Sequence, residues 1–135
     1  MTKIRTLWVD DKDNFPESTI LRIQNDLDKL GVDVEIEKLK DGNFVWETIR
    51  DWKPHVVMMD NNLESVQTNG GLLILEIRFV QNHDETPIIF YSSGMDDKLI
   101  QLVSTSANVT PTTRDDAHVE LFLEIKRLIE LINAS

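Results

Sequence analysis

Short apolar runs alternate along the chain with longer segments in which apolar residues recur at helical spacing. Two of the runs, TLWV and VVMM, are nearly continuous, as is typical of strands that helices cover on both faces. This alternation predicts strand–helix units around a mainly parallel sheet. The predicted strands are Ile4–Asp10, Val32–Leu39, His55–Asp60, Ile88–Ser92 and a weaker one at Asn108–Thr112.

Helical periodicity places a helix after each predicted strand. The first helix carries Ile20, Ile23 and Leu27 on one face and ends near Gly31, a residue suited to a left-handed cap. The others are predicted around Phe44–Trp52, at Leu72–Val80, at Asp96–Thr105, and behind the cap candidates Asp115 and Asp116. Pro111 predicts that the fifth strand is irregular or lies at an edge, because proline cannot donate to a ladder.

Composition narrows the class of protein. The chain has 135 residues, 41% hydrophobic and 28% charged, and no cysteine, which is typical of one globular domain that needs no disulfide. We therefore expect residues 1–135 to form a single domain without an effector domain. A net charge of −10 disfavours nucleic acid and anionic membranes as partners. No run of about 18 apolar residues predicts a membrane span, and we expect a cytoplasmic protein.

Acidic residues follow two of the predicted strands. Asp10 and Asp11 end the first strand, and Asp60 ends the third. If the strand order is 2-1-3-4-5, these strands are neighbours and the three carboxylates share one pocket. Unit charges about 4 Å apart repel by about 4 kcal/mol at an effective dielectric near 20, so a cation would stabilise them. Carboxylate oxygens favour Mg²⁺ or Mn²⁺, although Asp10 and Asp11 alone are also typical of a strand end and helix cap.

Three segments carry a family resemblance. LWVDD, PHVVMMDNNL and TPIIFYSSG, in this order and spacing, resemble the receiver domain of two-component response regulators, and the match extends over essentially the whole chain. The resemblance implies an α/β fold of the flavodoxin-like kind. In that fold a doubly wound, five-stranded parallel sheet of order 2-1-3-4-5 forms the middle of three layers.

The resemblance also implies roles for individual residues. Asp10 and Asp11 would bind Mg²⁺, and Asp60 would accept a phosphoryl group and also contact the metal. Asn62 would lend the metal a backbone carbonyl. Ser92 would donate a hydrogen bond to a phosphoryl oxygen.

The predicted fifth strand departs from the family pattern. The family has a lysine followed by proline there, whereas this chain has Thr110 before Pro111, which makes Thr110 the candidate phosphoryl-binding or switch residue at that position. The aromatic switch residue of the family is absent from 108–113. These departures leave metal binding in place but change how a signal would leave the site.

Three hypotheses follow. The first is a phosphoacceptor domain that receives a phosphoryl group on Asp60 from a histidine kinase or phosphotransfer protein and signals to a downstream protein by contact. Its catalysis would be at most self-phosphorylation from a phosphodonor and autodephosphorylation. The second is a pseudo-receiver, an interaction module that is not phosphorylated. The third is a phosphohydrolase of the haloacid-dehalogenase kind, in which Asp11 would be the nucleophile and Ser92 the second motif.

Overall fold

The computed structural model describes residues 2–10, 15–39, 44–61, 74, 86–92, 101, 108–113 and 116–134. Within them the elements are β1 (Thr2–Val9), α1 (Phe15–Asp28), β2 (Val32–Leu39), α2 (Val45–Trp52), β3 (Val56–Asp60), β4 (Ile88–Ser92), β5 (Val109–Thr113) and α5 (Ala117–Ala134). The helices predicted at 72–80 and 96–105 lie almost wholly outside the described residues. Among the described residues no helix combines the length and the apolar character needed to cross a bilayer.

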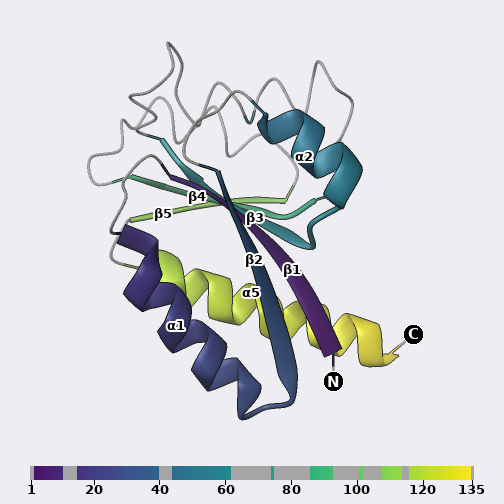
Figure 1. Cartoon of the computed structure of the whole chain (residues 1–135). Coiled ribbons are helices and arrows are strands. Elements are labelled where there is room, and N and C mark those ends of the chain that lie inside the picture. The colour runs from purple at the N-terminus through teal and green to yellow at the C-terminus, as the bar shows by residue number, and fades with distance from the viewer. Residues whose placement is uncertain are drawn as a thin grey trace.

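The strands form one five-stranded sheet in the order β2-β1-β3-β4-β5, and every neighbouring pair is parallel. Helices α1 and α5 cover one face of this sheet and α2 covers the other, so the molecule has three layers (Figure 1). The predicted flavodoxin-like class and strand order are confirmed. The point where the order reverses lies between β1 and β3, which are adjacent in the sheet but separated by β2 in the chain.

Alternation along the strands divides the core into two clusters. Successive side chains of a strand point to opposite faces. Trp8, Met58 and Tyr91 therefore pack with the apolar residues of α1 and α5. Their neighbours Val9 and Met59 pack with those of α2 on the other face. Because both faces are covered, β3 is buried at every position, which explains the continuous apolar run VVMM.

Left-handed residues end two of the helices. Gly31 has a φ of 78° and follows α1, and its N–H donates to the carbonyl of Asp28 at 3.0 Å. Lys53 has a φ of 54° and caps α2 by donating its N–H to the carbonyl of Ile49 at 3.0 Å. The end of the first helix at Gly31 was predicted from the sequence. The cap at Lys53 was not, because a lysine is not a typical sequence signal for a left-handed cap.

Strand β5 is an edge strand, as its proline indicates. Its bounds, Val109–Thr113, lie one residue beyond the predicted Asn108–Thr112. Asn108 instead adopts a positive φ of 58° and accepts a hydrogen bond from the N–H of Ile88 at 2.9 Å. Asparagine is one of the few residues that enter this conformation readily. The strand therefore begins only after this turn.

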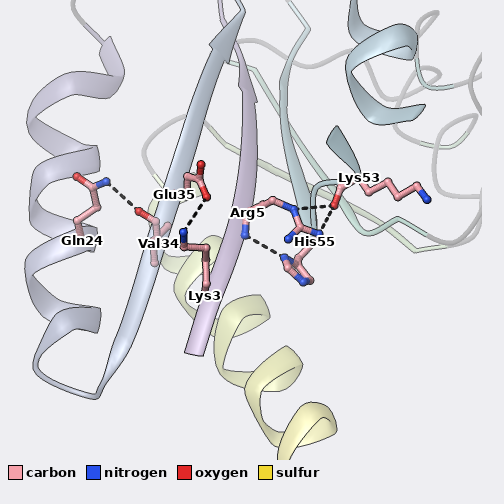
Figure 2. A network of polar contacts seen from close by, with 7 residues as sticks. All are labelled: Lys3, Arg5, Gln24, Val34, Glu35, Lys53 and His55. Atoms are coloured by element: carbon pink, nitrogen blue, oxygen red, sulfur yellow. Dashed lines mark hydrogen bonds and ion pairs between the residues drawn. The ribbon is translucent and has the colours of Figure 1, made fainter. Parts of the chain in front are cut away.

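A clip of side chains and backbone joins Arg5, in the middle of β1, to the segment before β3 (Figure 2). The backbone N–H of Arg5 donates to Nδ1 of His55 at 2.9 Å, and the N–H of His55 donates back to the carbonyl of Arg5 at 2.8 Å. The Arg5 guanidinium donates to the carbonyl of Lys53 through Nη2 at 2.8 Å and Nε at 3.1 Å. The clip thus continues the β1–β3 pairing below the first ladder pair, Thr6 with Val56.

Two further polar contacts in Figure 2 join α1 to β2 and β2 to β1. The side-chain amide of Gln24 donates to the carbonyl of Val34 at 3.0 Å, which ties α1 to β2. Lys3 of β1 pairs with Glu35 of β2 at 3.6 Å, with both side chains exposed. An exposed pair of this kind adds little to stability, so the alignment of β1 with β2 rests mainly on their ladder.

The clip predicts a pH-dependent stability. Partial burial and the charge of Arg5 lower the pKa of His55 below its ordinary value of 6.5. The folded state therefore favours neutral His55, whose Nδ1 accepts from Arg5. Its contribution is complete above the unfolded pKa and is lost as the pH falls below about 6.5 towards the folded pKa. Urea unfolding should show a smaller free energy of unfolding at pH 5.5 than at pH 8.

Two variants isolate this effect. His55→Ala leaves the Arg5 N–H without its acceptor and should lower the free energy of unfolding by about 1 kcal/mol at pH 8. His55→Asn keeps an acceptor that does not titrate, so its stability should change less between pH 8 and pH 5.5 than that of the wild type. Equal pH dependence in the wild type and His55→Asn would contradict the assignment.

Thr6 offers a stabilising substitution. Its side chain is fully buried in β1, and among the described residues its Oγ1 has no hydrogen-bond partner. A buried polar atom without a partner costs free energy. Thr6→Val should therefore raise the free energy of unfolding by about 1 kcal/mol in denaturant titration. Thr48→Val is the matched control, because Thr48 Oγ1 donates to the carbonyl of Phe44 at 2.7 Å and its removal should not stabilise.

Candidate functional site

Two buried carboxylates lie side by side at one edge of the sheet. Asp10 directly follows β1 and is 5% exposed, and Asp60 is the last residue of β3 and is fully buried. The ladder pairs Val9 with Met59, so the two aspartates occupy the next position on neighbouring parallel strands. Such strands lie about 4.8 Å apart. The structure therefore brings together the acidic strand ends that are 50 residues apart in the sequence.

Backbone hydrogen bonds hold both strand ends in place. The N–H of Asp10 donates to the carbonyl of Leu39 at 3.0 Å, which continues the pairing of β1 with β2. On the other side, the N–H of Asn61 donates to the carbonyl of Tyr91 at 2.9 Å and continues the pairing of β3 with β4. The end of β1 is thus anchored by β2, and the end of β3 is anchored by β4.

Tyr91 is a site residue that the sequence analysis missed. Its hydroxyl donates to Oδ2 of Asp10 at 2.7 Å and accepts from Nε1 of Trp8 at 2.8 Å, and all three side chains are buried. The ladder places Tyr91 opposite Asp60, so its ring crosses β3 to reach β1. The sequence did contain a signal for Tyr91, because it lies directly before Ser92 at the end of a predicted strand. Successive residues of a strand face opposite sides, and the ladder partner of Asp60 faces the same side as Asp60.

The electrostatics of Tyr91 reflect both carboxylates. Burial is the main cause that raises the pKa of the Tyr91 hydroxyl far above its ordinary value. The negative charge of Asp10, the hydrogen bond to Asp10 and the charge of Asp60 raise it further, whereas the Trp8 hydrogen bond lowers it. The phenol therefore stays protonated and remains a donor at the acidic edge throughout the physiological range of pH.

The chemistry of the donor set fits a hard divalent cation. Two carboxylates that are nearly free of solvent repel each other in a region of low dielectric, and carboxylate oxygens are the ligands that Mg²⁺ and Mn²⁺ prefer. Asp11 and Asn62, the other predicted ligands, lie outside the described residues. Within the described part of the chain, no group of three potential metal-ligating residues occurs. Asp10 and Asp60 are therefore the part of the predicted metal site that the structure places.

Ser92 and Thr110 have different positions relative to the carboxylates. Ser92 ends β4 one residue beyond the partner of Asp60, so its backbone reaches the same edge; its side chain is outside the described set. Thr110 pairs with Ile89 and lines a hollow with Pro87 near the opposite end of the strand. The structure therefore does not bring Thr110 to the site.

The register of β5 explains this difference. Thr112 lies opposite Tyr91 and Thr113 lies opposite Ser92, so these are the β5 residues at the level of the acidic edge. The sequence analysis used the proline as its landmark and selected the residue before it. Pro111 lies within the strand instead, opposite Phe90, and the strand continues two residues past it. A proline landmark cannot reveal such a continuation, because an edge strand tolerates proline.

Comparisons with known proteins agree with this architecture. No protein-family model and no curated protein sequence matches the chain. Solved structures do match it over nearly its full length. The chemotaxis protein CheY4 of Vibrio cholerae is 17% identical with a TM-score of 0.67, and the match covers 93% of this chain and 98% of that one.

Two other receiver structures are similar. The response regulator domain of Thermotoga maritima CheB is 23% identical, with a TM-score of 0.65 and coverage of 92% of this chain and 94% of that one. The signal receiver domain of an HD domain-containing protein of Pseudomonas fluorescens is 19% identical, with a TM-score of 0.71 and coverage of 98% and 99%. At these identities the likeness concerns the fold. The chain has the fold of response-regulator receiver domains, with two buried aspartates at the sheet edge where the strand order reverses.

Proposed function

We propose that the chain is a phosphoacceptor receiver of a two-component or phosphorelay system, in which Asp60 accepts the phosphoryl group. The observation that carries the proposal is the pair of buried carboxylates at the ends of β1 and β3. In open α/β sheets, ligands bind outside the carboxyl ends of the strands, where the strand order reverses. The receiver fold supports this signalling role.

The proposed reaction is a transfer between nucleophiles. An oxygen of the Asp60 carboxylate attacks the phosphorus of a phosphohistidine, the P–N bond breaks, the imidazole leaves, and an acyl phosphate forms. Asp10, Asp11 and Asp60, with the backbone carbonyl of Asn62, would hold Mg²⁺ or Mn²⁺. The cation, when bound, offsets the repulsion between carboxylates and phosphate and orients the incoming group. The Ser92 hydroxyl would donate to a phosphoryl oxygen.

Burial gives Asp60 a second property that suits this role. A fully buried carboxylate is shielded from bulk water, which strengthens its attraction to a bound cation and to neighbouring hydrogen-bond donors. Its two flanking strands fix its position through their ladders. Little further catalytic machinery is required, because positioning and electrostatic stabilisation dominate phosphoryl transfer.

The partners follow from the same proposal. The phosphodonor would be a histidine kinase or a phosphotransfer protein, and output would pass to a downstream protein by direct contact in the cytoplasm. The strong negative charge disfavours direct contact with nucleic acid. β5 offers threonines at the level of the acidic edge and contains no lysine, an observation that favours the pseudo-receiver as the second candidate.

Phosphoryl transfer to Asp60 is tested by intact mass after incubation with Mg²⁺ and acetyl phosphate. We expect a single phosphoryl adduct that requires Mg²⁺, disappears with a chelator, and is absent from Asp60→Asn. Asp11→Asn tests the phosphohydrolase hypothesis, in which Asp11 rather than Asp60 would be the nucleophile. A folded wild-type protein that binds Mg²⁺ but never gains the adduct would be a pseudo-receiver, and the proposal would be wrong.

The metal site is tested separately by calorimetric titration with Mg²⁺. Asp10→Asn removes one of the carboxylates and should weaken Mg²⁺ binding at least tenfold, because the lost attraction acts at short range in a buried site. Asp33→Asn is the matched control, since it makes the same change of charge at an exposed position of β2. Equal weakening in both variants would mean that net charge, and not a site at Asp10, controls the affinity.

A further inference from the structure

The hydrogen bonds that link Trp8, Tyr91 and Asp10 have only one direction. An indole nitrogen donates and never accepts, so the Tyr91 oxygen must accept from Trp8. The single phenolic hydrogen is then committed to Oδ2 of Asp10, which must accept it. The chain of donors therefore runs from the core towards the acidic edge and ends on a carboxylate that the proposed cation site uses.

The hydrogen bond from Tyr91 constrains the orientation of the Asp10 carboxylate. Tyr91 reaches it from β4, across the width of β3, a span of two strand spacings or about 10 Å. The ring is fully buried and packed in the cluster beneath α1 and α5, so the hydroxyl has little freedom to move. A hydrogen bond from a rigid donor selects one orientation of the carboxylate. In metal sites, such partners of ligating groups orient the ligands and tune affinity.

We propose that Tyr91 is the positioning residue of Asp10 for divalent-cation binding, and that its phenol links occupancy of the acidic site to Trp8 in the core beneath α1 and α5. The inference rests on the cation site of the proposed function. It deepens that proposal by naming a route from the site into one layer of the protein. Within the described part of β5 no aromatic side chain occurs, so the phenol that contacts the site comes from β4 instead.

The physical basis of the link is polarisation along the two hydrogen bonds. A cation that binds Asp10 redistributes electron density in the carboxylate that accepts the hydrogen bond from Tyr91. The Tyr91 oxygen and, through it, the Trp8 N–H then change their environment, because hydrogen bonds in a chain polarise one another. Trp46 and Trp52 belong to α2 and pack in the cluster on the other face of the sheet. They serve as internal references.

The experiment follows the three indole N–H signals by ¹H–¹⁵N NMR during a Mg²⁺ titration, with Trp8→Phe used to assign the Trp8 signal. In the wild type we expect the Trp8 signal to shift with the same dissociation constant that calorimetry gives. Tyr91→Phe removes only the hydroxyl, and we expect it to weaken Mg²⁺ binding about tenfold or more. At saturation, its Mg²⁺-induced Trp8 shift should shrink to the size seen for Trp46 and Trp52.

Thr6→Val is the matched control for loss of a buried hydroxyl. Thr6 lies on the same face of β1, two residues before Trp8, and its hydroxyl has no partner among the described residues. This variant should keep the wild-type Mg²⁺ affinity and the wild-type Trp8 shift. Equal loss of affinity in Thr6→Val and Tyr91→Phe would indicate a general effect of core packing and would overturn the positioning role.

Other outcomes separate this inference from the proposed function. A phosphoryl adduct on Asp60 together with unchanged Mg²⁺ affinity in Tyr91→Phe would overturn the inference and leave the proposed function standing. Absence of the adduct, with Mg²⁺ binding that depends on Tyr91, would do the reverse. If Mg²⁺ shifts the Trp8 indole signal equally in the wild type and in Tyr91→Phe, the link to the core would be overturned. If the wild type does not bind Mg²⁺, the inference as a whole would be overturned.

Discussion

The parallel pairing of β1 with β3 is the constraint on which the acidic site depends. It aligns Val9 with Met59 and so sets Asp10 beside Asp60, although β2 and two helices separate them in the chain. A slip of one residue would turn one carboxylate towards the other face of the sheet. The clip of Arg5, His55 and Lys53 reinforces the pairing at the opposite end of the β1–β3 ladder from the carboxylates. The stability of the sheet and the placement of the acidic pair thus depend on one ladder.

Because the two carboxylates are buried, neighbouring groups must stabilise their negative charges. A charge removed from water is stabilised only by donors or by an opposite charge. Tyr91 supplies one donor directly, and Trp8 holds that donor in place from below. In the proposed function, a bound cation and a phosphoryl group would interact with the same carboxylates. The apolar cluster beneath α1 and α5 keeps the local dielectric low, which strengthens the electrostatic interactions at the acidic edge.

Much of the fold could be predicted because its signals are local. Continuous apolar runs identified β1 and β3, helical periodicity and Gly31 identified α1, and Pro111 identified an edge strand. The site was predictable only in part. Strand ends show where Asp10 and Asp60 lie, but Thr110 was chosen from its place before a proline, whereas the β4–β5 register sets Thr112 and Thr113 at that level. Register depends on pairing between distant segments, and a motif of two residues does not contain it.

The amino-acid sequence by itself determined the class of fold, the strand order that the family resemblance implies, and the acidic chemistry at the strand ends. The class of fold and the acidic chemistry follow from periodicity and residue type, which act over a few positions, whereas the strand order follows from the resemblance alone. Only the tertiary structure decided that Tyr91 belongs to the site. Its hydroxyl meets Trp8 and Asp10 across 83 and 81 residues of sequence, and that meeting exists because β3 lies between β4 and β1 and the ring is long enough to cross it.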